Sequence, residues 1–136
     1  MCGLEKIYPK KHQRLSDKMG HLSNPLPLKT PIPPPKSSLA QWQQFVQTAC
    51  AELGWNKNSH LEIFLLLSEE VGELAQAVRY HTALHTPAHK QADKAAIAAE
   101  LADVLNYIAD LANYFDIDLD EALRQKWHEN AQRSWE

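Results

Sequence analysis

Glycine and proline are almost absent from residues 39–136 of this 136-residue chain. The only glycines there are Gly54 and Gly72, and the only proline is Pro87. Because these two residue types interrupt regular elements, long uninterrupted elements are expected in this region. No segment of it alternates between apolar and polar residues in the way that a half-buried strand does. The region is therefore predicted to be all-α.

Long apolar runs and cysteine pairs are lacking as well. No stretch of about 18 apolar residues occurs, so a membrane span is not expected. The N-terminus has no apolar run of the kind found in signal peptides. The two cysteines, Cys2 and Cys50, are too few and too far apart in the sequence for a disulfide framework. These absences predict a cytoplasmic protein without a membrane partner.

Charge is distributed unevenly along the chain. Residues 1–38 hold seven basic residues, two acids and seven of the eight prolines, which gives 7 − 2 = +5. Residues 39–136 hold seven basic residues and 15 acids, which gives 7 − 15 = −8. An acidic domain lacks the basic surface that nucleic acids require, so no nucleic-acid partner is expected. We expect a Pro-rich, basic tail without fixed structure at 1–38 and a helical domain at 39–136.

Capping residues divide the domain into four predicted helices. The first covers about residues 39–53 and ends at Gly54. The second begins at the capping box of Ser59 and Glu62 and runs to about Leu84. The third covers about 93–114, and the fourth runs from 118 or 120 to about 133. Short connections favour an antiparallel bundle, and so small a domain is expected to bury part of its apolar surface against a second subunit.

Two pairs of acids border the apolar stripes of the second and third helices. At about 100° per residue, Glu70 and Glu73 adjoin one stripe, and Glu100 and Asp103 adjoin the other. Residues three apart face the same way, so each pair can share a ligand. If the helices are neighbours, four carboxylates converge and repel one another unless a cation binds; an all-oxygen site favours Mg²⁺ or Mn²⁺. The spacing alone is also compatible with acids that are simply exposed to solvent and bind no ion.

The same acids lie in motifs that resemble those of MazG-like nucleoside triphosphate pyrophosphohydrolases. These motifs are EEVGELA at 69–75, ELADVLNY at 100–107, IDL at 117–119, and Lys126, Asn130 and Arg133 near the end. The resemblance covers about residues 39–135 and looks most like the dCTP pyrophosphatase branch. It implies an all-α, four-helix MazG-like bundle that completes its core by oligomerisation, as a homodimer or homotetramer.

The resemblance also implies an activity and a set of site residues. The activity is the Mg²⁺-dependent hydrolysis of a (deoxy)nucleoside triphosphate, dCTP-like, to a monophosphate and pyrophosphate, which keeps the nucleotide pool clean. The implied catalytic metal ligands are Glu70, Glu73, Glu100 and Asp103. The implied substrate contacts are Trp55, Tyr80, Tyr107, Lys126, Asn130 and Arg133. Tyr80 stands where that branch has tryptophan, and Trp55 is matched only by allowing a one-residue gap.

Two alternatives stay open. A phosphoribosyl-ATP or dUTP-type pyrophosphohydrolase would share the carboxylates and differ in the pocket, whereas a non-catalytic helical assembly module would use its acids only for solvation. A Nudix site is rejected, because the Arg-Glu pair that it needs ahead of the glutamates is replaced here by Phe64 and Leu65. A soft-metal site at His81, His85 and His89 is not expected either, because Pro87 breaks the helix between them.

Overall fold

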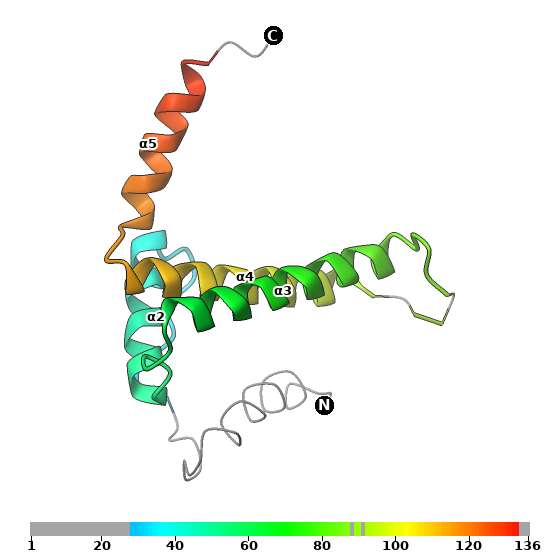
Figure 1. Ribbon diagram of the computed structural model, residues 1–136, viewed down its shortest axis with the longest axis horizontal. Helices are drawn as coiled ribbons and strands as arrows, with labels where there is room; N and C mark the ends of the chain where they lie inside the picture. Colours follow the sequence, from blue (N-terminus) through cyan, green and yellow to red (C-terminus); the bar gives the residue numbers. More distant parts are fainter. Residues whose placement is uncertain (1–27, 88, 91, 134–136) are drawn as a thin grey trace.

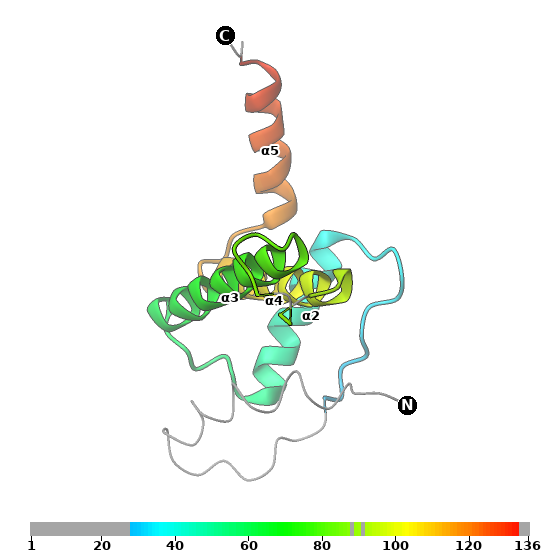
Figure 2. The ribbon, with the colours of Figure 1, turned by 90° about the vertical axis from the view of Figure 1, so that its right-hand side faces the viewer.

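The computed structural model describes residues 28–87, 89–90 and 92–133. Among these residues it contains four α-helices and no strand, which confirms the all-α prediction. The helices are α2 (Leu39–Leu53), α3 (His60–His81), α4 (Lys94–Tyr114) and α5 (Leu119–Ala131). α3 and α4 lie side by side as a long antiparallel hairpin, α2 crosses one end of it, and α5 extends away from that same end (Figures 1 and 2).

Two names are used below for the ends of this hairpin. The tip is the segment 79–94, which contains the α3–α4 loop, and the base is the opposite end, where α2 crosses and α5 begins (Figure 1). None of the helices in the described part of the chain has both the length and the apolar character needed to cross a membrane.

The helix starts follow the predicted capping residues. The backbone N–H of Glu62 donates to the Ser59 hydroxyl, and the Glu62 carboxylate accepts from the Ser59 N–H at 2.7 Å. This reciprocal pair satisfies N–H groups that have no partner within the first turn of α3. At the end of α2, Gly54 has a φ of 75°, the left-handed conformation that glycine adopts without strain.

The predicted end of the second helix is about three residues too late. α3 ends at His81 and not near Leu84. The Thr82 hydroxyl donates to the Val78 carbonyl at 2.9 Å, and Ala83 and His85 have positive φ angles of 55° and 46°. A helix cannot continue through residues in this conformation, so the chain turns before Pro87 is reached. α5 likewise ends slightly early, at Ala131.

The core of a single chain is small. Val46 and Cys50 of α2 pack with Ala109 of α4, and Phe45 and Leu119 cover them in part. Burial, followed by the charge of the neighbouring Asp110, raises the pKa of the Cys50 thiol to about 12. Cys50 is therefore a protonated, buried member of the core. No large side chain is fully buried among the described residues.

Only half of the predicted core stripe on α3 is covered. Ile63 is 2% exposed, but Phe64, Val71 and Val78 are 57%, 49% and 41% exposed. The apolar stripe of α3 is wider than the part of α3 that α4 covers. The sequence pattern therefore predicted more buried residues than a single chain contains. We call the uncovered residues of both helices the exposed stripe. It consists of Phe64, Val71 and Val78 on α3, and Leu101, Leu105 and Ile108 on α4.

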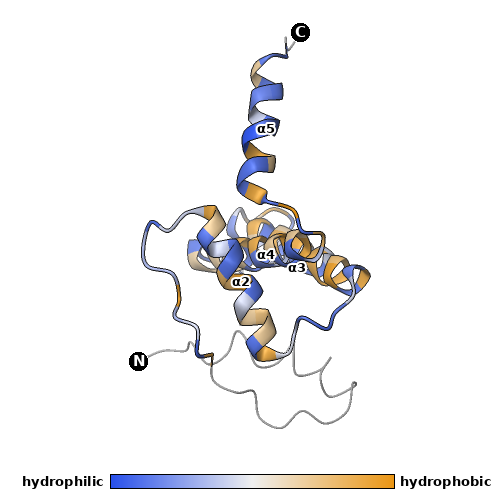
Figure 3. Ribbon diagram, turned by 90° about the vertical axis from the view of Figure 1, so that its left-hand side faces the viewer, coloured by the Kyte–Doolittle hydropathy of each residue, from blue (hydrophilic) through white to orange (hydrophobic). Residues whose placement is uncertain are grey.

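The two halves of the exposed stripe lie on one face of the hairpin. On each helix they are about a quarter turn from the residues that meet the other helix. Because α3 and α4 run antiparallel, these quarter turns lead to the same side. Figure 3 shows hydrophobic residues along α3 and α4, whereas hydrophilic residues dominate α5.

Residues 28–38, which composition assigns to the tail, follow a defined path beside α2. The N–H groups of Lys29 and Thr30 donate to Oε2 of Glu52 at 2.9 and 3.1 Å, and the Thr30 hydroxyl donates to Oε1 at 2.6 Å. These hydrogen bonds attach Lys29 and Thr30 to α2, and the domain boundary at residue 39 stays a prediction. Residues 1–27 lie outside the described residues, and the expectation for them stays a prediction.

Glu52→Gln should lower the melting temperature slightly at neutral pH, because the charged carboxylate accepts stronger hydrogen bonds than an amide. The hydrogen bonds from Thr30 and Lys29 lower the pKa of Glu52 from its ordinary value of 4.5. The stabilisation is therefore present above that value and is lost as the pH falls through the lower folded-state pKa. Circular dichroism melts of both proteins should converge in acid. A difference that persists at low pH would contradict this account.

Candidate metal centre

Three carboxylates meet between α3 and α4. One oxygen from each of Glu70, Glu100 and Asp103 lies within 4.8 Å of the other two. Glu70 comes from the middle of α3, and the other two lie three residues apart on α4, where they face the same way. The structure thus brings together three of the four side chains that were predicted as metal ligands.

Glu70 is buried more deeply than the sequence predicts. It is 7% exposed and is the one buried charged residue in the described part of the chain. The prediction placed it at the edge of the apolar stripe, but it lies in line with Ile63 and Ala77, the two buried residues seven positions away on either side. Seven residues are about two turns, so all three face α4. Three charged carboxylates held this close, one of them removed from water, repel one another strongly.

Glu73 lies one turn beyond Glu70 and is half-buried. Glu73 does not belong to the cluster of Glu70, Glu100 and Asp103, whose oxygens all lie within 4.8 Å of one another. Its assignment as a fourth ligand stays a prediction.

Tyr107 lies beside the cluster, one turn after Asp103 on α4. Burial raises the pKa of its phenol, and the negative charges of Glu70 and Asp103 raise it further. The phenol therefore keeps its proton at neutral pH and has the character of a hydrogen-bond donor. A donor at this position suits an anionic oxygen brought next to the carboxylates.

Asp110 is a residue that the sequence analysis did not assign to the site. Its charge also raises the pKa of Tyr107, and burial raises the pKa of Asp110 itself. It accepts a hydrogen bond from the Cys50 thiol, so it links the site to the core of α2. Asp110 lies seven residues after Asp103, so both acids lie on one side of α4. This spacing could have identified Asp110 from the sequence.

The aromatic residues predicted to contact a base lie at opposite ends of α3. Trp55, 37% exposed, precedes the helix, and Tyr80 is near its end. The guanidinium carbon of Arg79 is 4.8 Å from the centre of the Tyr80 ring. Since α3 has 22 residues and is about 33 Å long, Trp55 and Tyr80 of one chain cannot contact the same base.

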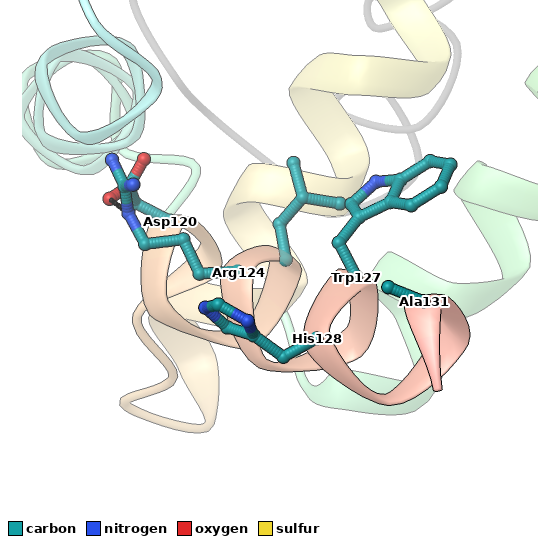
Figure 4. Close-up of a pocket in the computed structure, with 6 residues that line it drawn as sticks. Asp120, Arg124, Trp127, His128 and Ala131 are labelled. Carbon is teal, nitrogen blue, oxygen red and sulfur yellow. Dashed lines mark hydrogen bonds and ion pairs between the residues drawn. The ribbon is translucent and has the colours of Figure 1, made fainter. Parts of the chain in front are cut away.

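The predicted contacts near the C-terminus are also remote from the carboxylates of the same chain. Lys126 and Asn130 lie on α5 and Arg133 just beyond it, and α5 contacts mainly α2 while extending away from the hairpin (Figure 1). Lys126 Nζ is 3.4 Å from Glu129 Oε2. A shallow pocket on α5 involves other side chains (Figure 4). Its lining residues are Asp120, Leu123, Arg124, Trp127, His128 and Ala131.

The chemistry of the donor set indicates which cation would fit between α3 and α4. All three groups are carboxylates, and no histidine or cysteine of the described residues belongs to the cluster. Oxygen-only ligation favours a hard divalent ion such as Mg²⁺ or Mn²⁺, whereas zinc and copper sites usually include nitrogen or sulfur. The cluster therefore fits the kind of cation that the sequence predicts.

A family model described as the MazG nucleotide pyrophosphohydrolase domain matches residues 58–134, more than half of the chain. The chain belongs to the MazG nucleotide pyrophosphohydrolase family. The match spans α3, α4 and α5 and includes all three carboxylates of the cluster. It confirms the MazG-like resemblance and indicates a hydrolase that acts on nucleotides, while the dCTP branch stays a prediction. A comparison with curated proteins finds no match.

Asp103→Asn and Glu100→Gln should weaken cation binding to this MazG domain, because each removes one charged ligand. Isothermal titration with Mn²⁺ should show affinity lowered about tenfold or more. Without cation, each variant should be at least as stable as the native protein, since one source of repulsion is gone. With Mg²⁺, its melting temperature should rise less.

The matched control is Glu129→Gln, which removes a carboxylate on α5 far from the cluster. It should bind Mn²⁺ as the native protein does. Native Mn²⁺ affinity in both cluster variants would show that these carboxylates do not hold the ion.

Proposed function

We propose that this protein is a Mg²⁺-dependent pyrophosphohydrolase that converts a (deoxy)nucleoside triphosphate to the monophosphate and pyrophosphate, and so removes unwanted nucleotides from the cytoplasmic pool. Mn²⁺ is a chemically suitable substitute for Mg²⁺. The observation that supports the proposal most strongly is the convergence of Glu70, Glu100 and Asp103 within a domain of the MazG family.

The three carboxylates explain why a cation is needed. A triphosphate is a polyanion, and Glu70, Glu100 and Asp103 would repel it if it entered the site alone. The cation, when bound, neutralises the phosphate oxygens and the charge that develops in the transition state. The three side chains would hold the ion between α3 and α4, close to Tyr107.

The remaining residues supply proton transfer and positioning. A glutamate of α3, Glu70 or Glu73, orients the attacking water and takes up its proton. The protonated Tyr107 phenol donates a hydrogen bond to a phosphate or sugar oxygen. Lys126 and Arg133 bring positive charge to the phosphates, and Asn130 adds a polar contact.

This set of contacts requires more than one copy of the chain. Within one copy, Trp55 and Tyr80 lie at opposite ends of α3, and α5 extends away from the carboxylates (Figure 2). A homodimer or homotetramer would bring α5 or the far end of α3 from one copy to the cluster of another. The exposed stripe supports this, because a row of six large apolar side chains on one face is unusual for a protein that stays monomeric.

The proposed substrate is a pyrimidine deoxynucleotide similar to dCTP, on the resemblance described above. A dUTP-type or phosphoribosyl-ATP pyrophosphohydrolase would use the same carboxylates with a different base pocket. A non-catalytic helical assembly module would show no turnover with any of these compounds. Neither nucleic acid nor a membrane is expected as a partner.

Product identity tests the proposal. The purified protein with Mg²⁺ should convert at least one of dCTP, dUTP, the other deoxynucleotides or phosphoribosyl-ATP to a monophosphate and intact pyrophosphate. Phosphorus NMR and anion-exchange chromatography distinguish these products from a diphosphate and orthophosphate. Turnover should stop in excess chelator and in Asp103→Asn, and it should continue in Glu129→Gln. Primary release of orthophosphate, or full turnover in chelator, would overturn the proposal.

A further inference from the structure

A row of polar side chains follows the side of α4 that faces α3. Asp103, Tyr107, Asp110 and Tyr114 are three or four residues apart, so they lie along one side of the helix. Both ends of the row meet α3. Asp103 belongs to the carboxylate cluster with Glu70, and the Tyr114 hydroxyl is 3.4 Å from Nδ1 of His60. The row therefore runs from the cluster towards the base of the hairpin and away from its tip.

Asp110 lies in this row at the point where α2 crosses the hairpin. Its half-buried carboxylate accepts a hydrogen bond from the Cys50 thiol of α2. The backbone carbonyl of the same cysteine accepts from the N–H of Trp55 at 2.8 Å. Asp110 and Trp55 are thus both direct neighbours of Cys50. A hydrogen-bond acceptor and an aromatic residue predicted to contact a base come together at this corner of one chain.

The spacing along α4 suits the length of a nucleotide. Asp110 is seven residues beyond Asp103, a distance of about 10 Å along the helix axis. The sugar and base attached to a phosphate extend over a similar length. A nucleotide whose phosphates lie at the carboxylate cluster can therefore place its sugar beside Tyr107 and the edge of its base beside Asp110.

The Cys50 thiol alone does not explain a carboxylate at this position. A thiol is a weak hydrogen-bond donor, so it offsets little of the cost of removing a charged group from water. Burial raises the pKa of Asp110 in spite of this hydrogen bond, which is the sign of such a cost. A second donor, brought by a bound molecule, would offset more of it.

We propose that Asp110 selects the base of the nucleotide, by accepting a hydrogen bond from the exocyclic amino group of cytosine. This role rests on the proposed function and narrows its substrate class to cytosine nucleotides. Uracil and thymine carry a carbonyl oxygen where cytosine carries the amino group. A carboxylate only accepts hydrogen bonds, so it attracts the amino group and repels that oxygen.

A series of three substrates tests this role in the native, full-length protein. They are dCTP, dUTP and the analogue with 2-pyrimidinone as its base, which has a hydrogen atom in place of the amino group. The value of kcat/KM should be highest for dCTP, about tenfold lower for the analogue, which loses the hydrogen bond, and lower again for dUTP, whose oxygen is repelled. Equal values for dCTP and the analogue would overturn the role of Asp110.

Asp110→Asn tests the same role from the side of the protein. Asparagine keeps the shape of the side chain and can accept from Cys50 through its oxygen, while its amide nitrogen can donate to the carbonyl of uracil. The ratio of kcat/KM for dCTP to that for dUTP should therefore fall about tenfold or more. The control is Glu121→Gln, which neutralises an exposed acid on α5 and should keep the native ratio.

Circular dichroism establishes that each variant keeps its helices, and if Asp110→Asn does not fold, the substrate series in the native protein decides alone. A folded Asp110→Asn variant with the native ratio would overturn the proposal, because a structural partner of Cys50 would not affect the choice of base.

Binding measurements separate this inference from the proposed function. Calorimetry with dCTP and dUTP analogues that have a methylene group between the α- and β-phosphorus atoms requires no hydrolysis. Tighter binding of the dCTP analogue that depends on Asp110, without turnover of any nucleotide, would refute the proposed function alone. Turnover without a preference that depends on Asp110 would refute this inference alone.

Discussion

Electrostatic repulsion among Glu70, Glu100 and Asp103 is the constraint on which the rest of the structure depends. Their oxygens lie within 4.8 Å of one another, and Glu70 is buried. Helices α3 and α4 must pack together to form the hairpin, so these charges cannot move far apart. A divalent cation bound there would convert the repulsion into attraction and would offer positive charge to a polyanion. The negative charges also act on neighbouring groups, because they keep Tyr107 protonated beside the cluster. Asp110, which accepts a hydrogen bond from Cys50, connects this part of α4 to the core.

A second constraint comes from the shape of the fold. One long hairpin crossed by α2 cannot bury the apolar residues that its own helices carry, and Phe64 and Leu65 are more than half exposed. α5 leaves the hairpin at the base, since Gln43 of α2 holds the α4–α5 turn through hydrogen bonds to the carbonyl of Ile117 at 2.7 Å and from the N–H of Leu119 at 3.1 Å. Because α2 crosses the hairpin at its base and holds the α4–α5 turn there, α5 covers neither the exposed stripe nor the carboxylates.

Local chemistry made much of the fold predictable. Helix boundaries depend mainly on residues that are close in the sequence. The structure places helix starts at Ser59, with Glu62, and at Asp93, and a helix end at Gly54. The spacing of three residues placed Glu100 and Asp103 on one side of the helix, because helical spacing is fixed. These features required no knowledge of tertiary contacts.

The remaining features depend on contacts between distant residues. Periodicity gave the width of the α3 stripe but not how much of it α4 covers, so Glu70 was placed at an edge and not on the buried line with Ile63. Composition could not show that Thr30 meets Glu52, a partner 22 residues away. The direction of α5 depends on Gln43, whose role no local pattern reveals.

The binding of a non-hydrolysable nucleotide, measured with and without cation, tests the central claim most directly. A nucleoside triphosphate with a methylene group between the α- and β-phosphorus atoms cannot be cleaved there, so calorimetry reports binding alone. If the carboxylates hold a cation that receives the phosphates, the analogue should bind in Mg²⁺ and show no measurable binding in excess chelator. Equal affinity in both conditions would show that the triphosphate does not depend on an ion held by Glu70, Glu100 and Asp103.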